Sequence, residues 1–379
     1  MKILELCHFS AGICGVWQRV KQESERLTKN NQVLVISSNV TKGTWEIAPP
    51  EENLYGFKII RKPFKKFGGE SFMSWDFEKE ALDFKPDVII AHSYRHLHTT
   101  HALKLAKKLK KQGINCKVFL VTHAPFGRKR SLIQSIFVSL YDTFKGKSTL
   151  NKFNKVIAIT KWEIPYLEKL GLEKNKITYI PNGIPEEFFT IKNSSKSTKS
   201  KEENKILFLG RVSPIKNLEV MLKALSSIND KNLFLEIVGP VEEEYKLKLE
   251  ALIKQLGLEK KVLFSKPIYD VKEKINKIDS CRFFILPSIS EGMPQSLVEA
   301  MSRGKIVIAS DNLASRDLVE DKKNGFIFNN NDKKDLSEKI NLLLISDEKV
   351  LNKVRLEASN SVKKFNWKII ISQINELFR

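Results

Sequence analysis

Short apolar runs alternate with longer amphipathic stretches along most of the chain. Runs such as Val88–Ala91 and Ile306–Ala309 lack polar alternation, as is typical of strands buried on both faces of a parallel sheet. Stretches such as Val16–Lys29 and Thr99–Lys111 have helical spacing. Further strands are expected at residues 3–6, 33–36, 118–121 and 156–159, and at 206–209, 233–238, 262–264 and 283–286. The alternation predicts an α/β fold with parallel sheets.

The length of the chain predicts two such sheets rather than one. A chain of 379 residues exceeds the roughly 150–200 residues that one domain usually holds. Residues 191–204 contain almost no apolar side chain, which is typical of a flexible loop. We therefore expect a domain junction just before this segment.

The net charge indicates what kind of partner the protein binds, and the cysteine content indicates which cellular compartment it occupies. The formal net charge of +21 favours an anionic partner, which can be a nucleotide, a membrane surface or a nucleic acid. The four cysteines are widely spaced and form no C-x-x-C pair, so we expect neither a disulfide framework nor a zinc knuckle. No run approaches the roughly 18–20 apolar residues that span a bilayer. A cytoplasmic protein is expected.

Three histidines follow predicted strands of the first half. His8, His92 and His123 each come where a strand ends, and ligands of open parallel sheets bind at that edge. This placement favours a role in lining a cleft. No metal site is expected among the histidines at 92, 96, 98 and 101, because no cysteine or carboxylate completes a recognisable ligand set.

The most specific chemical signal is the segment Glu291–Glu299, which follows a buried strand and leads into a helix. A helix N-terminus offers unpaired N–H groups and partial positive charge, which suit a diphosphate. Gly292 allows close backbone approach, and Pro294 stiffens the start of the helix. Glu299 can accept hydrogen bonds from two vicinal hydroxyls, as a ribose offers. Taken alone, the segment also fits a helix with two solvated glutamates.

A second loop carries two cations. Arg211 and Lys216 follow the strand at 206–209, where they suit the neutralisation of a leaving diphosphate. Two surface cations in a lysine-rich protein are the ordinary alternative, and this alternative fits Lys216 better than Arg211.

Taken in order, these motifs resemble the retaining glycosyltransferase family 4, which has the GT-B fold. The resemblance rests on Tyr179–Ile184, Gly210-Arg211 with Lys216, Glu291-Gly292-Met293-Pro294, Glu299-Ala300-Met301, Gly304–Ser310 and Asn324-Gly325-Phe326. It implies two Rossmann-like parallel-sheet domains facing across a cleft. The acceptor domain would comprise 1–184, with a C-terminal helix at about 361–379 packing back on it, and the nucleotide-sugar domain would comprise 185–360.

The resemblance also implies residue roles. Glu299 would bind the ribose, and Glu291 and His123 would act at the transferred sugar as catalytic residues. The implied donor-binding residues are Gly15, Arg211, Lys216, Gly292, Met293, Pro294, Gln295, Ser296, Leu297 and Glu299, with Gly12 in the same glycine-rich loop as Gly15. Backbone near Ser265–Ile268 is expected to contact the base.

Retention of anomeric configuration, no cofactor and no bound metal are further implications, and no Asp-x-Asp triplet occurs in the chain. Two positions depart from the family pattern. Asn312-Leu313-Ala314 replaces a glycine-rich turn, and Cys14 stands where glycine is common.

Two segments of the first half bear on the acceptor. Lys58–Phe67 mixes cations with aromatic side chains, and apolar residues recur at helical spacing from Leu132 to Phe144. Arg128–Arg130 precede the second segment, and Lys145 and Lys147 follow it. A helix lying on an anionic membrane fits this pattern and would suit a lipid-linked or phospholipid acceptor. A helix packed on its own sheet fits the pattern about equally well.

The sequence thus predicts a glycosyltransferase with a nucleotide-sugar donor, cytoplasmic or peripheral on the cytoplasmic membrane face. A GT-B-like sugar-nucleotide epimerase and a donor-binding scaffold without turnover are alternatives. A nucleic-acid-binding protein would explain the net charge directly. Nucleic acid is not the expected partner, because the cations are spread along the chain and no nucleic-acid-binding motif is present.

Overall fold

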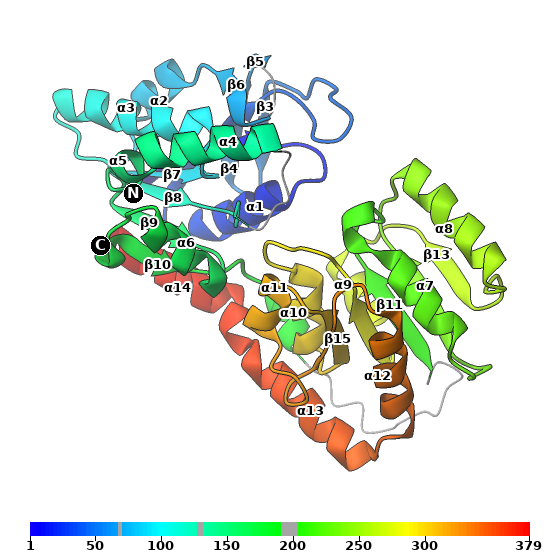
Figure 1. Ribbon diagram of the computed structural model, residues 1–379. Helices are drawn as coiled ribbons and strands as arrows, with labels where there is room; N and C mark the ends of the chain where they lie inside the picture. The colour runs from blue at the N-terminus through cyan, green and yellow to red at the C-terminus, as the bar shows by residue number, and fades with distance from the viewer. Residues whose placement is uncertain (67–69, 127–131, 191–203) are drawn as a thin grey trace. The chain divides into compact units, whose positions relative to one another are not determined.

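The computed structural model describes residues 1–66, 70–126, 132–190 and 204–379. Within these ranges the chain forms two compact units (Figure 1). The first comprises Met1–Asn182 together with Ile370–Arg379, and the second comprises Gly183–Ile369. Most of the polar segment expected as a loop at 191–204 lies outside the described residues. None of the helices in the described ranges is long and apolar enough to cross a membrane.

The first unit is built on an eight-stranded sheet with the order β10-β9-β8-β7-β1-β2-β4-β3. Its strands are parallel except for β3, which runs antiparallel to β4. The strands are β1 (Lys2–Phe9), β2 (Gln32–Ser38), β3 (Glu51–Leu54), β4 (Phe57–Lys62), β7 (Val88–His92), β8 (Lys117–Val121), β9 (Lys155–Ala158) and β10 (Ile177–Tyr179), and a separate hairpin joins β5 (Phe64–Lys66) to β6 (Met73–Trp75). All five strands expected in this half are present.

Helices of the first unit follow its strands. They are α1 (Gly15–Leu27), α2 (Glu78–Phe84), α3 (Leu97–Lys111), α4 (Leu132–Tyr141), α5 (Lys147–Leu150) and α6 (Ile164–Lys169), with a π-helical turn at Asp142–Gly146 between α4 and α5. Short 3-10 turns occupy Glu70–Phe72, Lys161–Glu163 and Lys174–Lys176. The last helix, α14 (Trp367–Phe378), begins in the second unit and joins the first from Ile370 onward, later than the expected position of about 361.

The basic segment Lys58–Phe67 lies partly in β4 and β5 rather than in a surface loop. Phe57, Ile59 and Arg61 alternate inward along β4, and all three are buried. The Arg61 guanidinium donates to Ser10 Oγ at 2.8 Å and pairs with Glu52. Part of the charge in this segment therefore holds the sheet together, because a buried cation needs polar partners.

The second unit is a six-stranded sheet in which every pair is parallel, with the order β13-β12-β11-β14-β15-β16. Its strands are β11 (Lys205–Leu209), β12 (Phe234–Val238), β13 (Val262–Ser265), β14 (Phe283–Leu286), β15 (Ile306–Ser310) and β16 (Phe326–Phe328). Its helices are α7 (Leu218–Ser226), α8 (Glu243–Gln255), α9 (Val271–Asp279), α10 (Gln295–Ser302), α11 (Leu313–Leu318), α12 (Lys333–Ile345) and α13 (Glu348–Ser361), with 3-10 turns at Glu186–Phe189, Pro214–Lys216 and Lys363–Phe365. The five strands predicted for this half are confirmed, whereas three-residue β16 gave no signal.

Gly183 and Trp367 join the two ends of the second unit. The Ile184 N–H donates to the Phe365 carbonyl at 2.7 Å, and the Trp367 N–H donates to the Ile184 carbonyl at 3.2 Å. Trp367 is fully buried, and a Cβ at Gly183 would lie 2.2 Å from Cδ2 of its indole ring. The glycine in the Asn182-Gly183 motif is therefore explained by close packing.

We expect Gly183→Ala to destabilise the second unit by about 1–3 kcal/mol, because the added methyl overpacks the Trp367 ring. Scanning calorimetry would show this as a lower transition temperature. Gly15→Ala is the matched control, since a Cβ there meets nothing within 4 Å. Equal stability of the two variants would contradict the packing argument.

Candidate active site

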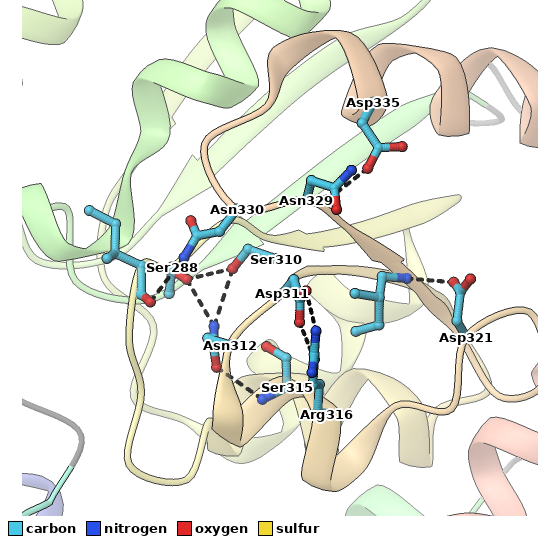
Figure 2. Close-up of polar contacts among 12 residues, drawn as sticks. Ser288, Ser310, Asp311, Asn312, Ser315, Arg316, Asp321, Asn329, Asn330 and Asp335 are labelled. Carbon is cyan, nitrogen blue, oxygen red and sulfur yellow. Dashed lines mark hydrogen bonds and ion pairs between the residues drawn. The ribbon is translucent and has the colours of Figure 1, made fainter.

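The loop between β14 and α10 is held by hydrogen bonds from three other loops. The Ile289 N–H donates to the carbonyl of Ile215, at 2.9 Å, in the loop after β11. Asn330 Nδ2 donates to the Ile289 carbonyl at 3.1 Å, and the Ser310 hydroxyl donates to the Ser288 carbonyl (Figure 2). The two loops that carry the predicted donor-binding residues are thus joined directly, and the β14–α10 loop is fixed on both sides.

Asn312 links this loop to the following helix. Its Nδ2 donates to the Ser288 carbonyl at 2.9 Å, while its Oδ1 accepts from the Ser315 N–H at 3.0 Å and caps α11 (Figure 2). Asn312 stands where the family pattern has a glycine-rich turn. The side chain therefore positions the loop that precedes Glu291.

Glu291 and Lys216 form an ion pair, in which Lys216 Nζ contacts Oε1 of the carboxylate. The same oxygen accepts from Ser288 Oγ at 2.7 Å. Both charged side chains are mostly buried, with side-chain exposures of 18% for Lys216 and 13% for Glu291. Two residues that the sequence placed on separate motifs therefore meet at the carboxyl edge of one sheet.

Glu299 is buried on α10, and its Oε1 pairs with Lys274 Nζ of α9 at 2.9 Å. Sequence reasoning missed Lys274, because a lysine in the lysine-rich stretch 271–279 carries no distinguishing signal. The helix itself starts at Gln295 after Pro294, which supplies no side-chain cap. The predicted ribose-binding carboxylate is thus held by Lys274 inside the first two turns of α10.

Arg211 is placed apart from the Lys216–Glu291 pair. Its side chain is 54% exposed, and Nη1 lies 3.9 Å from a carboxylate oxygen of Glu242. An exposed pair at this distance contributes little stability, so the guanidinium can be redirected at small cost.

A further carboxylate, Glu236 of β12, lies beside the segment expected to contact a base. It accepts from Ser265 Oγ at 2.6 Å and from Lys277 Nζ at 2.8 Å, and Lys205 Nζ lies at 3.2 Å. Burial would raise its pKa, but the bonds from Lys277 and Ser265 outweigh burial and lower it. This cluster fixes the carboxyl end of β13.

His123 of the first unit lies in a strained loop after β8. His123 and Ala124 have φ angles of 59° and 51°, in the left-handed region that side chains with a Cβ rarely adopt. The buried Glu163 carboxylate holds this loop, accepting from Thr122 Oγ1 at 2.5 Å and from the Ala124 N–H at 2.8 Å. Its other oxygen accepts from the backbone of residues 159–160. Glu163, which sequence reasoning missed, therefore sets the position of His123.

His123 is connected to a buried carboxyl through His92. His92 Nδ1 lies 2.9 Å from His123 Nε2, and His92 Nε2 lies 2.6 Å from Glu5 Oε2. Burial raises the pKa of Glu5 to about 8 and lowers that of His92 to about 3. At pH 7 both are then neutral, so Glu5 donates to His92 and His92 donates to His123. This order places the remaining proton of His123 on Nδ1.

His8 and the glycines Gly12 and Gly15 were also predicted to lie at the ligand site. His8 contacts His96 and His98 rather than joining the His92–His123 pair. Gly12 has φ +81°, and a Cβ there would lie 2.3 Å from the Lys42 carbonyl, so a backbone contact explains this glycine. Gly15 has no such packing reason, because a Cβ at that position meets nothing within 4 Å.

Comparison with known families identifies the class of enzyme to which the chain belongs. A family model described as Glycosyltransferase Family 4 matches residues 13–188, and one described as Glycosyl transferases group 1 matches residues 190–361. The chain is a family 4 glycosyltransferase. It therefore catalyses transfer of a sugar.

Two curated relatives of this glycosyltransferase carry specific names. The Campylobacter jejuni N,N'-diacetylbacillosaminyl-diphospho-undecaprenol alpha-1,3-N-acetylgalactosaminyltransferase is 26% identical over 66% of each chain. The Escherichia coli UDP-Gal:alpha-D-GlcNAc-diphosphoundecaprenol alpha-1,3-galactosyltransferase is 28% identical over 78% of this chain and 75% of its own.

Solved structures agree on the GT-B fold. Sucrose-phosphate synthase from Thermosynechococcus elongatus aligns with a TM-score of 0.76 and 18% identity, covering 100% of this chain and 98% of its own. Anabaena HepE in complex with UDP and glucose aligns with a TM-score of 0.73 and 18% identity, covering 99% and 98%.

Glu5→Gln of the glycosyltransferase tests the neutral hydrogen-bond chain. Because the folded pKa is raised from 4.5 to about 8, the folded state holds this proton more tightly, and Glu5 costs stability as pH rises from about 5 to about 8. Glutamine keeps a neutral donor and cannot ionise. We therefore expect the melting temperature of the variant, relative to the wild type, to increase between pH 5 and pH 8.5.

The exposed Glu78→Gln is the control, since its carboxylate pairs only at the surface with Lys108. If the melting temperatures of Glu5→Gln and the wild type differed by the same amount at every pH in this range, Glu5 would not be protonated in the folded enzyme.

Proposed function

We propose that this glycosyltransferase takes its sugar from a nucleotide-diphosphate donor held by the second unit and passes it to a lipid-linked acceptor with retention of configuration. The single observation that carries the donor assignment is the arrangement around α10. The uncapped helix start, Glu291 and the buried Glu299 lie on the loop after β14 and its helix, and Lys216 reaches Glu291 from the loop after β11.

The start of α10 suits the diphosphate. The Leu297 N–H already donates to the Pro294 carbonyl at 3.1 Å, whereas the N–H groups of Gln295 and Ser296 have no acceptor within the described ranges. Such N–H groups, together with the helix dipole, bind anions. Gly292 and Met293 lead the backbone to this point, and Lys216 adds a cation beside it.

Glu299 suits the ribose. Lys274 Nζ contacts Oε1, and Oε2 can accept a hydrogen bond from a hydroxyl. An ionised acceptor forms stronger hydrogen bonds than a neutral one, with net values of about 1.5–3 kcal/mol. Removal of this carboxylate should therefore act mainly on donor affinity.

The reaction needs stabilisation of charge on the departing diphosphate. Lys216, Arg211 and the α10 N–H groups supply it without a metal, because they place positive charge where negative charge develops. Glu291, whose Oε1 is fixed by Lys216 and Ser288, acts beside the sugar. His123 donates from Nδ1 to a sugar oxygen, and Gly15 leaves room for the donor phosphates. No residue is assigned as a covalent nucleophile.

Helix α4 supports a membrane-bound acceptor. Ile136, Phe137, Leu140 and Phe144 share one face of α4 and the turn after it, and all four are exposed, by 59%, 66%, 48% and 76%. Tyr141 of the same predicted stripe is half-buried against the core of the first unit, so the stripe is packed in part and exposed in part. Lys145 and Lys147 follow directly and are exposed, whereas Arg128–Arg130 lie outside the described residues.

An exposed apolar face flanked by cations fits the surface of an anionic bilayer. The names of the two curated relatives include diphospho-undecaprenol acceptors, which are membrane lipids. We therefore place the enzyme peripherally on the cytoplasmic face of a membrane, with α4 as the contacting helix.

Glu299→Ala and Glu291→Ala should separate binding from turnover. We expect Glu299→Ala to raise the Kd for the donor nucleotide at least about tenfold, corresponding to about 1.4 kcal/mol. Glu291→Ala should lower kcat by about 10²–10³-fold with a smaller change in Kd, because its effect lies in the transition state. Calorimetry with UDP, GDP and ADP sugars and a transfer assay measure the two quantities.

Glu338→Ala provides the control, since this glutamate lies exposed on α12. If both site variants matched the control in Kd and kcat, the donor-site assignment would be wrong.

Liposome flotation tests the membrane contact. The double variant Phe137→Ser and Phe144→Ser should lose most of the flotation that the wild type shows with anionic vesicles at low salt. High salt should weaken the wild-type signal, because the lysine contribution is screened. Ile345→Ser removes an apolar side chain that is 84% exposed on α12 and should float like the wild type. Equal flotation of all three proteins would exclude α4 as the contact.

A further inference from the structure

A second histidine cluster lies at the carboxyl edge of the first unit's sheet, apart from the His92–His123 chain. His8 comes from the end of β1, and His96 and His98 lie at the start of α3. His8 Nδ1 is 3.1 Å from His98 Nδ1, and His96 Nδ1 is 3.2 Å from both ring nitrogens of His8. One nitrogen of each ring lies within 4.8 Å of the others.

Backbone carbonyls determine which ring nitrogens carry protons. His98 Nε2 lies 2.6 Å from the carbonyl of His92, and His8 Nε2 lies 2.5 Å from the carbonyl of Glu70. A carbonyl only accepts, so both Nε2 atoms carry hydrogen. In neutral rings both Nδ1 atoms are then bare lone pairs, although they face each other at 3.1 Å.

Two facing lone pairs repel each other, so the contact requires a positive species between them. The His8 and His98 rings make three close contacts, namely one from each Nε2 to a carbonyl and one between the two Nδ1 atoms. Each contact needs a hydrogen or a cation between its two electronegative atoms, and two neutral rings supply only two hydrogens. The positive species is either a proton shared by His8 and His98, which are 5% and 1% exposed, or a metal ion bound by both Nδ1 atoms. Each would be a buried charge, and the titration described below separates the two.

The surroundings resemble the outer shell of a metal site. The ring of Trp75 lies 5.1 Å from that of His8 and 4.9 Å from that of His98, which limits access of water. In metal sites the non-ligating histidine N–H usually donates to a carbonyl or carboxylate, which orients the ring. His8 and His98 both show this arrangement.

We propose that His8, His96 and His98 bind a divalent transition-metal ion of the zinc class through their Nδ1 atoms. Zinc–nitrogen bonds of about 2.0–2.1 Å in a tetrahedron place the nitrogens roughly 3.3–3.4 Å apart. The separations from His8 Nδ1 to the Nδ1 atoms of His98 and His96 are close to this value, and the three ligand atoms lie within 4.8 Å of one another. His96 is half-buried, and its ring stands at 81° to that of His8.

The ion would join the end of β1 to the start of α3 and keep a fourth position open to solvent or an oxygen ligand, as three-ligand zinc sites do. The site uses residues of the first unit alone. It is therefore separate from the proposed metal-free handling of the donor diphosphate, and the two proposals can fail independently.

Cobalt(II) titration of the full-length, untagged, chelator-stripped protein tests the proposal. We expect one Co²⁺ per chain, with visible absorption bands of a four-coordinate ion and displacement by one equivalent of Zn²⁺. His96→Ala should weaken Co²⁺ binding at least about tenfold, a loss of the size seen when metal-site residues are removed. His96 is half-buried, so its removal should leave the fold intact.

His101→Ala is the matched control, since His101 lies on the same helix, is also half-buried and is not in the cluster. It should bind Co²⁺ like the wild type. Absence of stoichiometric Co²⁺ binding by the wild type would overturn the proposal and leave a shared proton between His8 and His98. Equal affinities of His96→Ala and His101→Ala would also overturn it.

Discussion

Where a buried parallel strand ends, the backbone N–H and C=O groups that follow need new hydrogen-bond partners. The rest of the structure depends on this requirement. The central strands of both sheets, such as β7 and β15, are buried along their length, and their backbone groups are paired within the sheet only as far as the strand extends. Beyond the end of each strand, backbone and side-chain groups of the loops hydrogen-bond to one another. Ile289 uses the carbonyl of Ile215, Ser288 is held by Asn312, and Glu163 closes the loop around His123. The functional residues lie on the loops that are fixed in this way.

The two units handle charge differently. In the second unit, carboxylates are paired with lysines, as in Lys216–Glu291 and Lys274–Glu299. These pairs keep an anionic and a cationic group side by side at the proposed donor site. Beside His123 in the first unit, burial raises the pKa of Glu5 and lowers that of His92, so protons rather than ions determine the direction of the hydrogen bonds in this chain. The first arrangement suits phosphate binding, and the second suits orientation of a neutral sugar hydroxyl.

Much of the fold could be predicted from the sequence, because buried parallel strands leave solid apolar runs such as Val88–Ala91. Strands β4 and β16 could not, since β4 alternates inward Arg61 with outward lysines and β16 has only three residues. The fold's GT-B class followed from the motif order, as the family models and the solved structures confirm.

The partners of the site residues were harder to predict. Glu291 and Lys216 were recognised on separate motifs, but their contact is set by the Ile215–Ile289 bond between loops. Lys274 looks like any other lysine in its helix. The contact between His8 and His96 could not be predicted for a similar reason, because the two residues lie 88 positions apart in the chain.

The central claim is that the loop after β14 and helix α10 hold the nucleotide of the donor. A crystal structure of the full chain with bound UDP tests it most directly. The account predicts phosphate oxygens within hydrogen-bond distance of the Gln295 and Ser296 N–H groups, with a ribose hydroxyl on the Glu299 carboxylate. UDP bound with its phosphates away from α10, or with its ribose out of reach of Glu299, would contradict the account.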